Sequence, residues 1–161
     1  MQYQIESAMY LVGQLFLIPT LALISLLFLY AFWVLGEFVM LALRRRKGEG
    51  KALLAAFRKQ PDMSDDALDV LAHKMLETQR IASRVAPMLG LVATMIPMGP
   101  ALKSLSDGNL ADVSGNLTVA FSAVILALIA ASITYWVVNV RRRWLAEELL
   151  EIATLKQGSA R

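Results

Sequence analysis

The stretch APMLGLVATMIPMGPALK, residues 86–103, is apolar enough to cross a membrane, yet its backbone is unsuited to a plain anchor. It carries no charge before Lys103, but it holds three prolines and two glycines. Each proline removes an amide donor and frees a carbonyl about one turn earlier. At membrane depth, such carbonyls are tolerated where protein, water or a cavity satisfies them. The stretch therefore predicts a membrane-spanning helix that meets water or a polar partner.

Charge-free runs on either side of this stretch predict two further spans. Ser7–Gly36, Val85–Leu102 and Val113–Val140 hold no charged residue over 30, 18 and 28 residues. A helix needs about 20 apolar residues to cross the hydrocarbon core. The whole chain of 161 residues is 57% hydrophobic and only 18% charged, against about a quarter charged in soluble domains. We expect an all-α membrane protein with three transmembrane helices at about residues 11–43, 85–105 and 115–140.

Basic residues gather at one end of each expected span, in the groups Arg44–Lys47, Arg80 with Arg84, and Arg141–Arg143. Cytoplasmic loops carry the excess of lysine and arginine, so the N-terminus is expected outside and the C-terminus in the cytoplasm. The arginine runs adjoin span ends and lack interleaved aromatics, so no nucleic-acid partner is expected. The predicted organisation is a periplasmic N-terminus and first span (1–43), a cytoplasmic helical loop (44–84), a transmembrane hairpin (85–140) and a cytoplasmic C-terminal helix (141–161).

The two cytoplasmic segments read as helices. KALLAAFRKQ, residues 51–60, predicts a short helix ended by Pro61. Ser64 is suited to cap a second helix, which we expect to run into the second span with Pro87 as a kink. RRRWLAEELLEIATLK, residues 141–156, predicts a helix with a mostly apolar stripe that includes Glu148. So small a segment buries little core by itself, so these helices are expected to pack on each other or on a neighbouring subunit.

No catalytic chemistry can be assembled from the residue types present. The chain has one histidine, His73, and no cysteine, and its acids do not cluster. A nucleophile with its base, a metal set or a carboxylate pair is therefore missing. We expect no enzyme activity, no catalytic residue, no metal and no cofactor, and a solvated His73.

Small and polar residues inside the spans are the informative feature. At 100° per residue, Pro87, Gly90, Thr94, Met98 and Ala101 share one face of the second span. Pro97 and Pro100 free carbonyls near Ala93 and Ile96. The third span has a polar face of Ser114, Thr118, Ser122, Ser132 and Asn139, opposite an alanine face of Ala120, Ala123, Ala127, Ala130 and Ala131. Such faces serve either for close helix packing or for lining a narrow pore, and the pattern alone leaves both uses open.

Two charges adjoin the spans and are candidates for a functional role. Glu37 lies one or two turns before the basic end of the first span, where it can pair with Arg44 or reach the interface. Lys103 lies near the outer end of the second span and can also reach the interface. Neither lies at mid-membrane. A proton path through this chain would therefore need a carboxylate from another molecule.

Two stretches resemble a known family. RVAPMLGLVATM, residues 84–95, resembles the motif that opens the second span of the MotA/TolQ/ExbB proton-channel family: Ala-Pro, then Leu-Gly-Leu, two residues and Thr. AFSAVILALIAASITYWVVN, residues 120–139, is similar to the alanine-rich last span of that family, which ends near an asparagine. The resemblance covers residues 80–145 and identifies the chain as a short ExbB/TolQ-like member.

The resemblance implies a homopentamer in a bacterial-type inner membrane, with the second and third spans around a central pore. The pore would hold the transmembrane helix of a single-span ExbD/TolR/MotB-like subunit whose aspartate takes and releases protons. Proton flow would drive transport across the outer membrane, envelope maintenance or motility. Thr94 falls on the pore-facing threonine of the second span.

The chain departs from the family pattern in its third span. Val124 stands at the second pore threonine, Val119 at a glutamate and Ile133 at a common proline. Val124 belongs with the alanine face, so the resemblance directs Ala120, Val124, Ala127 and Ala131 to the pore. The polar face would then pack against the first span or the next subunit.

The expected function is a stator-like subunit of a motor driven by the proton-motive force. Val119 and Val124 favour an alternative of another class, a non-conducting membrane scaffold or assembly protein with the same fold. A third, less favoured alternative is a small proton-coupled exporter that uses Glu37 as its proton carrier.

Overall fold

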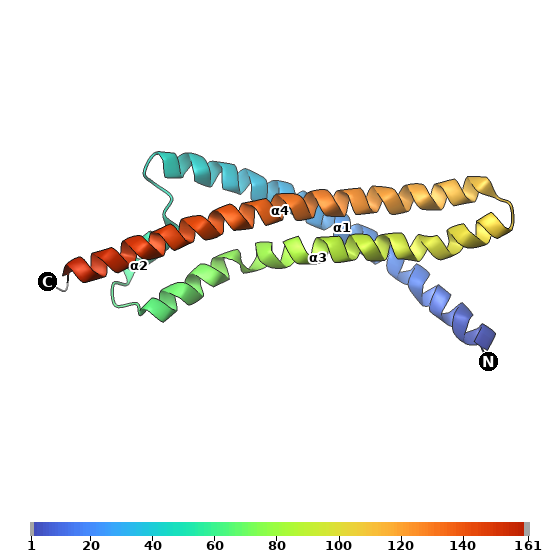
Figure 1. The fold of residues 1–161 in the computed structure, drawn as a ribbon, viewed down its shortest axis with the longest axis horizontal. Helices are drawn as coiled ribbons and strands as arrows, with labels where there is room; N and C mark the ends of the chain where they lie inside the picture. The colour runs from blue at the N-terminus through green and yellow to red at the C-terminus, as the bar shows by residue number, and fades with distance from the viewer. Residues whose placement is uncertain (1, 160–161) are drawn as a thin grey trace. The chain divides into compact units, whose positions relative to one another are not determined.

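The computed structural model describes residues 2–159, with side chains from 11 to 158. Every regular element in this range is a helix (Figure 1). The order is α1 (Gln2–Arg46), α2 (Ala52–Lys59), α3 (Asp65–Ser106) and α4 (Leu110–Ser159). Within the described residues, α1, α3 and α4 are long and apolar enough to cross a membrane. The predicted all-α class is confirmed, and so is the presence of three helices able to span a membrane.

Both long helices of the hairpin extend well beyond their apolar runs. α3 begins at Asp65, where the Ala67 amide donates to Ser64 Oγ at 3.2 Å, so the predicted serine cap is confirmed. The helix then continues without interruption through Pro87, Pro97 and Pro100 to Ser106. The expectation that the helix of the loop runs into the second span is therefore confirmed as well.

The connection between α3 and α4 is shorter than residues 106–114, the gap between the second and third expected spans. Only residues 107–109 lie outside the helices. Gly108 has a φ of 74°, a left-handed conformation that glycine adopts at little cost. Asn109 then caps α4, because its Oδ1 accepts from the Asp112 amide at 3.3 Å. This capping starts α4 at Leu110, five residues before the expected start of the third span.

The chain divides into two compact units. The first unit comprises Met1–Phe32 and Ala82–Ser132, and the second comprises Trp33–Ile81 and Ile133–Arg161. Small residues dominate the core of the first unit, which joins α1, α3 and α4 through Ile24, Ala93, Ala123 and Ala127.

The second unit has a larger aliphatic core. Its buried residues come from α2, α3 and α4, namely Leu53, Leu54, Leu68, Ala72, Leu76, Leu145 and Ile152. The apolar faces of the two loop helices and of the end of α4 thus cover one another. The structure thus realises the first of the two expected arrangements, in which these helices pack on each other.

Candidate ion-pathway site

The helices α3 and α4 of the first unit approach each other closely at Gly90. A Cβ added to Gly90 would lie 2.9 Å from Ala127 Cβ and 3.3 Å from Val124 Cγ2. Real Cβ atoms do not come so near a neighbouring Cβ, so only glycine permits this spacing. The structure thereby brings together three residues that the sequence assigned to the ion pathway, Gly90, Val124 and Ala127.

Thr94 lies one turn after Gly90 and is partly exposed. Its Oγ1 donates to the carbonyl of Leu91 at 2.7 Å. A hydroxyl that donates in this way still has lone pairs with which to accept a hydrogen bond. Because Pro97 has no amide hydrogen, the carbonyl of Ala93 also lacks its usual helical donor. Thr94 and this carbonyl are therefore adjacent polar groups inside an apolar span.

The residues predicted to share one face of the second span fall into two sets in the structure, one buried within the chain and one exposed. Gly90 and Ala101 are buried within the chain, whereas Met98 is 45% exposed. Thr94 lies at the border between the two sets, and Pro87 is also partly exposed. The division arises because α1 and α4 cover one side of α3 and leave the other side open.

The alanine face of α4 is used for packing within the chain. Ala120, Ala127 and Ala131 are 2%, 0% and 8% exposed. Val124, at the edge of this face, keeps part of its surface exposed. Small side chains allow helices to approach closely, so in this chain the alanines serve the first of the two uses that the pattern left open.

The polar face of α4 is exposed and does not pack against α1, contrary to one of the two expectations for it. Thr118 Oγ1 donates to the carbonyl of Ser114 at 2.8 Å, and Ser122 Oγ donates to the carbonyl of Thr118 at 2.8 Å. Each hydroxyl is thus satisfied by the preceding turn of its own helix. This bonding lowers the cost of an exposed hydroxyl in an apolar span.

The two charge candidates lie at the ends of the spans. Glu37 Oε1 accepts from Arg141 Nη1 at 3.3 Å. The partner is on α4 and is not Arg44, which the sequence offered as one of two possibilities for Glu37. The reason is that α1 packs beside α4 in the second unit, where Phe38 stacks on Trp144 with ring centroids 5.2 Å apart. Lys103 is exposed near the end of α3.

Among the described residues, the most enclosed charged group is Glu148, which belongs to the mostly apolar stripe of residues 141–156 and had no predicted role. Its side chain is 2% exposed, and Oε1 accepts from Arg45 Nη1 at 2.5 Å. Oε2 accepts from the amide of Leu53 at 2.9 Å and from that of Leu54 at 3.4 Å. These amides begin α2 and have no acceptor within the helix. A carboxylate from α4 therefore caps α2, and one acid in an apolar stripe is the signal that could have revealed it.

Arg45 makes further contacts that fix the end of α1. Its Nη2 donates to the carbonyl of Trp144 and to Glu147 Oε2, each at 3.2 Å. The guanidinium also lies over the Trp144 ring, 5.0 Å from the centroid.

The structure offers no metal site in the part of the chain that it describes. Within the described residues, no group of three or more His, Cys, Asp or Glu side chains could hold a metal ion.

Comparison with family models decides the class of this site. The model of the MotA/TolQ/ExbB proton channel family matches residues 42–154, which include α2, α3 and most of α4. The chain belongs to this family. The MotA/TolQ/ExbB match confirms the resemblance inferred from residues 80–145 and extends it through the loop helices. Comparison with curated proteins and with solved structures gives no significant match.

Family membership and the three apolar helices together make the chain a multi-pass membrane protein of a proton-channel family. The MotA/TolQ/ExbB family couples ion passage to work and is not a family of enzymes. Gly90, Thr94 and Val124 all lie within the matched region.

Proposed function

We propose that this chain is the ring-forming, stator-like subunit of a motor driven by the proton-motive force in a bacterial-type inner membrane. Five copies surround the transmembrane helix of an ExbD/TolR/MotB-like subunit with a single span. The single observation that carries the proposal is the proton-channel family match over residues 42–154, which contains the helix pair with Thr94.

The burial of the pathway residues suggests how each contributes. Thr94, Met98 and Val124 keep exposed surface and face the inserted helix in this proposal. The buried small residues act behind them, since they let α3 and α4 pack closely enough to form a thin wall: Gly90, Ala101, Ala120, Ala127 and Ala131. The exposed polar face of α4 meets the next subunit.

The titrating acid belongs to the partner in this proposal. The charge-free runs of the spans contain no carboxylate, so the chain itself offers uncharged polar groups, among them hydroxyls and backbone carbonyls. Thr94 and the carbonyls freed by Pro97 and Pro100 accept hydrogen bonds from the protonated form of the partner's aspartate or from the water around it. The chain would then guide the proton, while the acid that binds and releases it belongs to the partner.

The role of Thr94 is tested by proton flux into liposomes that contain the chain with its partner. We expect Thr94→Val to lower the flux at least about tenfold, because about 1.4 kcal/mol, the size of one lost hydrogen bond, corresponds to a factor of ten. Thr94→Ser keeps the hydroxyl and is expected to retain most of the flux. A pH-sensitive dye inside the liposomes measures both.

A matched control is available in the C-terminal part of α4. Thr154 Oγ1 donates to the carbonyl of Glu151 at 2.7 Å, the same local bond that Thr94 makes, but outside the spans. Thr154→Val should leave the flux unchanged. Native mass spectrometry should show five times the mass of the 17.8 kDa chain for every variant. Normal flux in a Thr94→Val pentamer would rule out the proposed role.

A non-conducting scaffold is the second candidate, and Val119 and Val124 favour it. Both are aliphatic at positions where the sequence resemblance expects a glutamate and a threonine. A scaffold would assemble with its partner and show no dissipation of a pH gradient, even in the unmodified chain. The same liposome assay therefore separates the two functions.

A further inference from the structure

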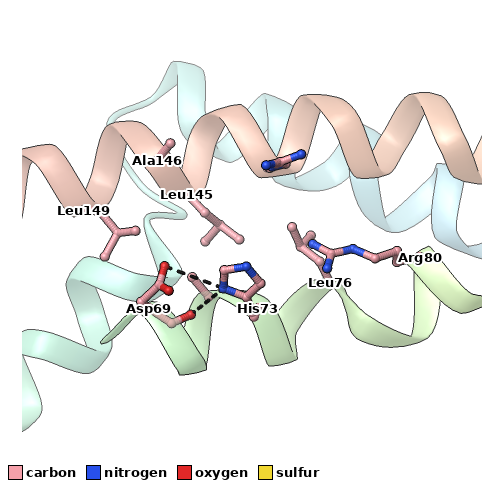
Figure 2. Close-up of a pocket in the computed structure, with 9 residues that line it drawn as sticks. Asp69, His73, Leu76, Arg80, Leu145, Ala146 and Leu149 are labelled. Carbon is pink, nitrogen blue, oxygen red and sulfur yellow. Dashed lines mark hydrogen bonds and ion pairs between the residues drawn. The ribbon is translucent and has the colours of Figure 1, made fainter. Parts of the chain in front are cut away.

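A pocket of about 210 Å³ lies between α3 and α4 in the second unit. Its floor is apolar, because Ala72, Leu76 and Leu145 line it and are 6%, 2% and 8% exposed. Its walls are basic, with His73 and Arg80 from α3 and Arg142 from α4. Figure 2 shows the His73 ring and the Arg80 side chain in the space between the two helices.

One basic residue of this pocket, Arg142, has no carboxylate partner among the described residues. Asp69 is the acid that lines it, and its carboxylate lies 3.6 Å from His73 Nδ1. The arginines on either side of Arg142 each have a carboxylate partner: Arg141 pairs with Glu37 at 3.3 Å and Arg143 with Glu147 at 4.0 Å. The guanidinium of Arg142 has none among the described residues. An arginine without a counter-ion thus borders a pocket with an apolar floor.

The position of the pocket along the helices indicates what anion would reach it. Arg142 is the second residue after the charge-free run Val113–Val140, and Arg80 precedes the run Val85–Leu102 by five residues. At 1.5 Å per residue, both lie within about 8 Å of the end of an apolar run. The headgroup region of a bilayer begins at that level. Phosphodiesters are therefore the anions present there at the highest local concentration.

We propose that this pocket binds the phosphate of an acidic phospholipid. Arg142 and Arg80 donate to the phosphate oxygens, a geometry for which the guanidinium fork is suited. His73 lies beside them, with its Nδ1 2.9 Å from the backbone carbonyl of Asp69. Basic pockets between membrane helices at this level are suited to acidic headgroups, and the apolar floor favours a lipid over an acidic peptide. The site is independent of the proposed proton pathway.

The test is a lipid titration of the purified full-length protein in detergent, followed by native mass spectrometry. Phosphatidylglycerol should bind in a saturable manner and at least about tenfold more tightly than phosphatidylcholine. Arg142→Gln and Arg80→Gln should each weaken phosphatidylglycerol binding about tenfold, a loss of about 1.4 kcal/mol. Arg142→Lys keeps the charge without the fork and should fall between these variants and the unmodified chain.

The matched control is Arg46→Gln. Arg46 is exposed at the basic end of α1, so its removal changes the net charge equally. Its phosphatidylglycerol affinity should stay within about twofold of the unmodified chain, since attraction by general surface charge is shared by all basic residues near the membrane. If each variant keeps the melting temperature of the unmodified chain, misfolding does not explain the weaker lipid binding.

Three results would overturn the assignment. Equal losses for Arg46→Gln and Arg142→Gln would show general charge attraction without a site. Saturable binding of inorganic phosphate that displaces the lipid at millimolar concentration would identify a soluble anion as the ligand. A change of oligomeric mass in lipid-free Arg142→Gln would place the pocket in a subunit interface.

Discussion

At the scale of single residues, the carboxylate of Glu148 holds three segments of the second unit together. It contacts Arg45 at the end of α1 and the first amides of α2, and it extends from α4. A buried ion pair adds little net stability when whole, yet removing one partner costs about 3–5 kcal/mol. The reason is that the guanidinium of Arg45 loses its buried counter-ion, and the amides of Leu53 and Leu54 lose the carboxylate that accepts from them.

We expect Glu148→Gln to lower the free energy of unfolding by about 3 kcal/mol. For a chain of this size, that corresponds to a melting temperature lower by about 6–12 °C. Glu147→Gln is the matched control, because Glu147 also contacts Arg45 but its side chain is 57% exposed. Its effect should stay below about 1 kcal/mol. Thermal unfolding in detergent measures both, and equal shifts would contradict the capping role of Glu148.

At the scale of helices, Gly90 sets the spacing of α3 and α4. Gly90→Ala places a methyl group 2.9 Å from Ala127 Cβ, which should cost about 1–3 kcal/mol through overpacking. Gly99 is the matched control in the same helix, with no atom within 4 Å of an added Cβ. Gly99→Ala should instead stabilise the helix by about 0.5–1 kcal/mol. Melting temperatures should therefore shift in opposite directions.

A compensating change sharpens this test. Adding Ala127→Gly to Gly90→Ala restores the space between the helices and should recover most of the lost stability. Residues in contact are expected to show such coupling, whereas independent sites add. Strictly additive losses in the double variant would show that the close approach at Gly90 does not limit the packing.

At the scale of the whole molecule, the orientation in the membrane is open to a direct test, because the chain contains no cysteine. We expect Asp107→Cys, in the exposed turn between α3 and α4, to react with an impermeant maleimide in intact cells. Asp62→Cys, in the exposed connection between α2 and α3, should react only after the membrane is permeabilised. The reverse pattern would invert the predicted topology.

The sequence by itself determined the helical class, the three spans and the family. Each of these depends on local properties: charge-free runs long enough to span a bilayer, arginines at their ends, and the Ala-Pro and Leu-Gly-Leu motif before Thr94. It left open whether the loop helices pack on each other or on a neighbouring subunit, but it predicted the serine cap of α3. Such features follow from neighbouring residues, so they can be read without knowing the fold.

Only the tertiary structure decided which helix faces are covered and which charges are paired. The alanine face of α4 could have packed or lined a pore, and the contact of Ala127 with Gly90 shows that it packs. Glu37 pairs with Arg141, 104 positions away, and Glu148 caps a helix 95 positions before it. Helical periodicity identifies a face but not its partner, because the partner is fixed by the packing of segments that are distant in the chain.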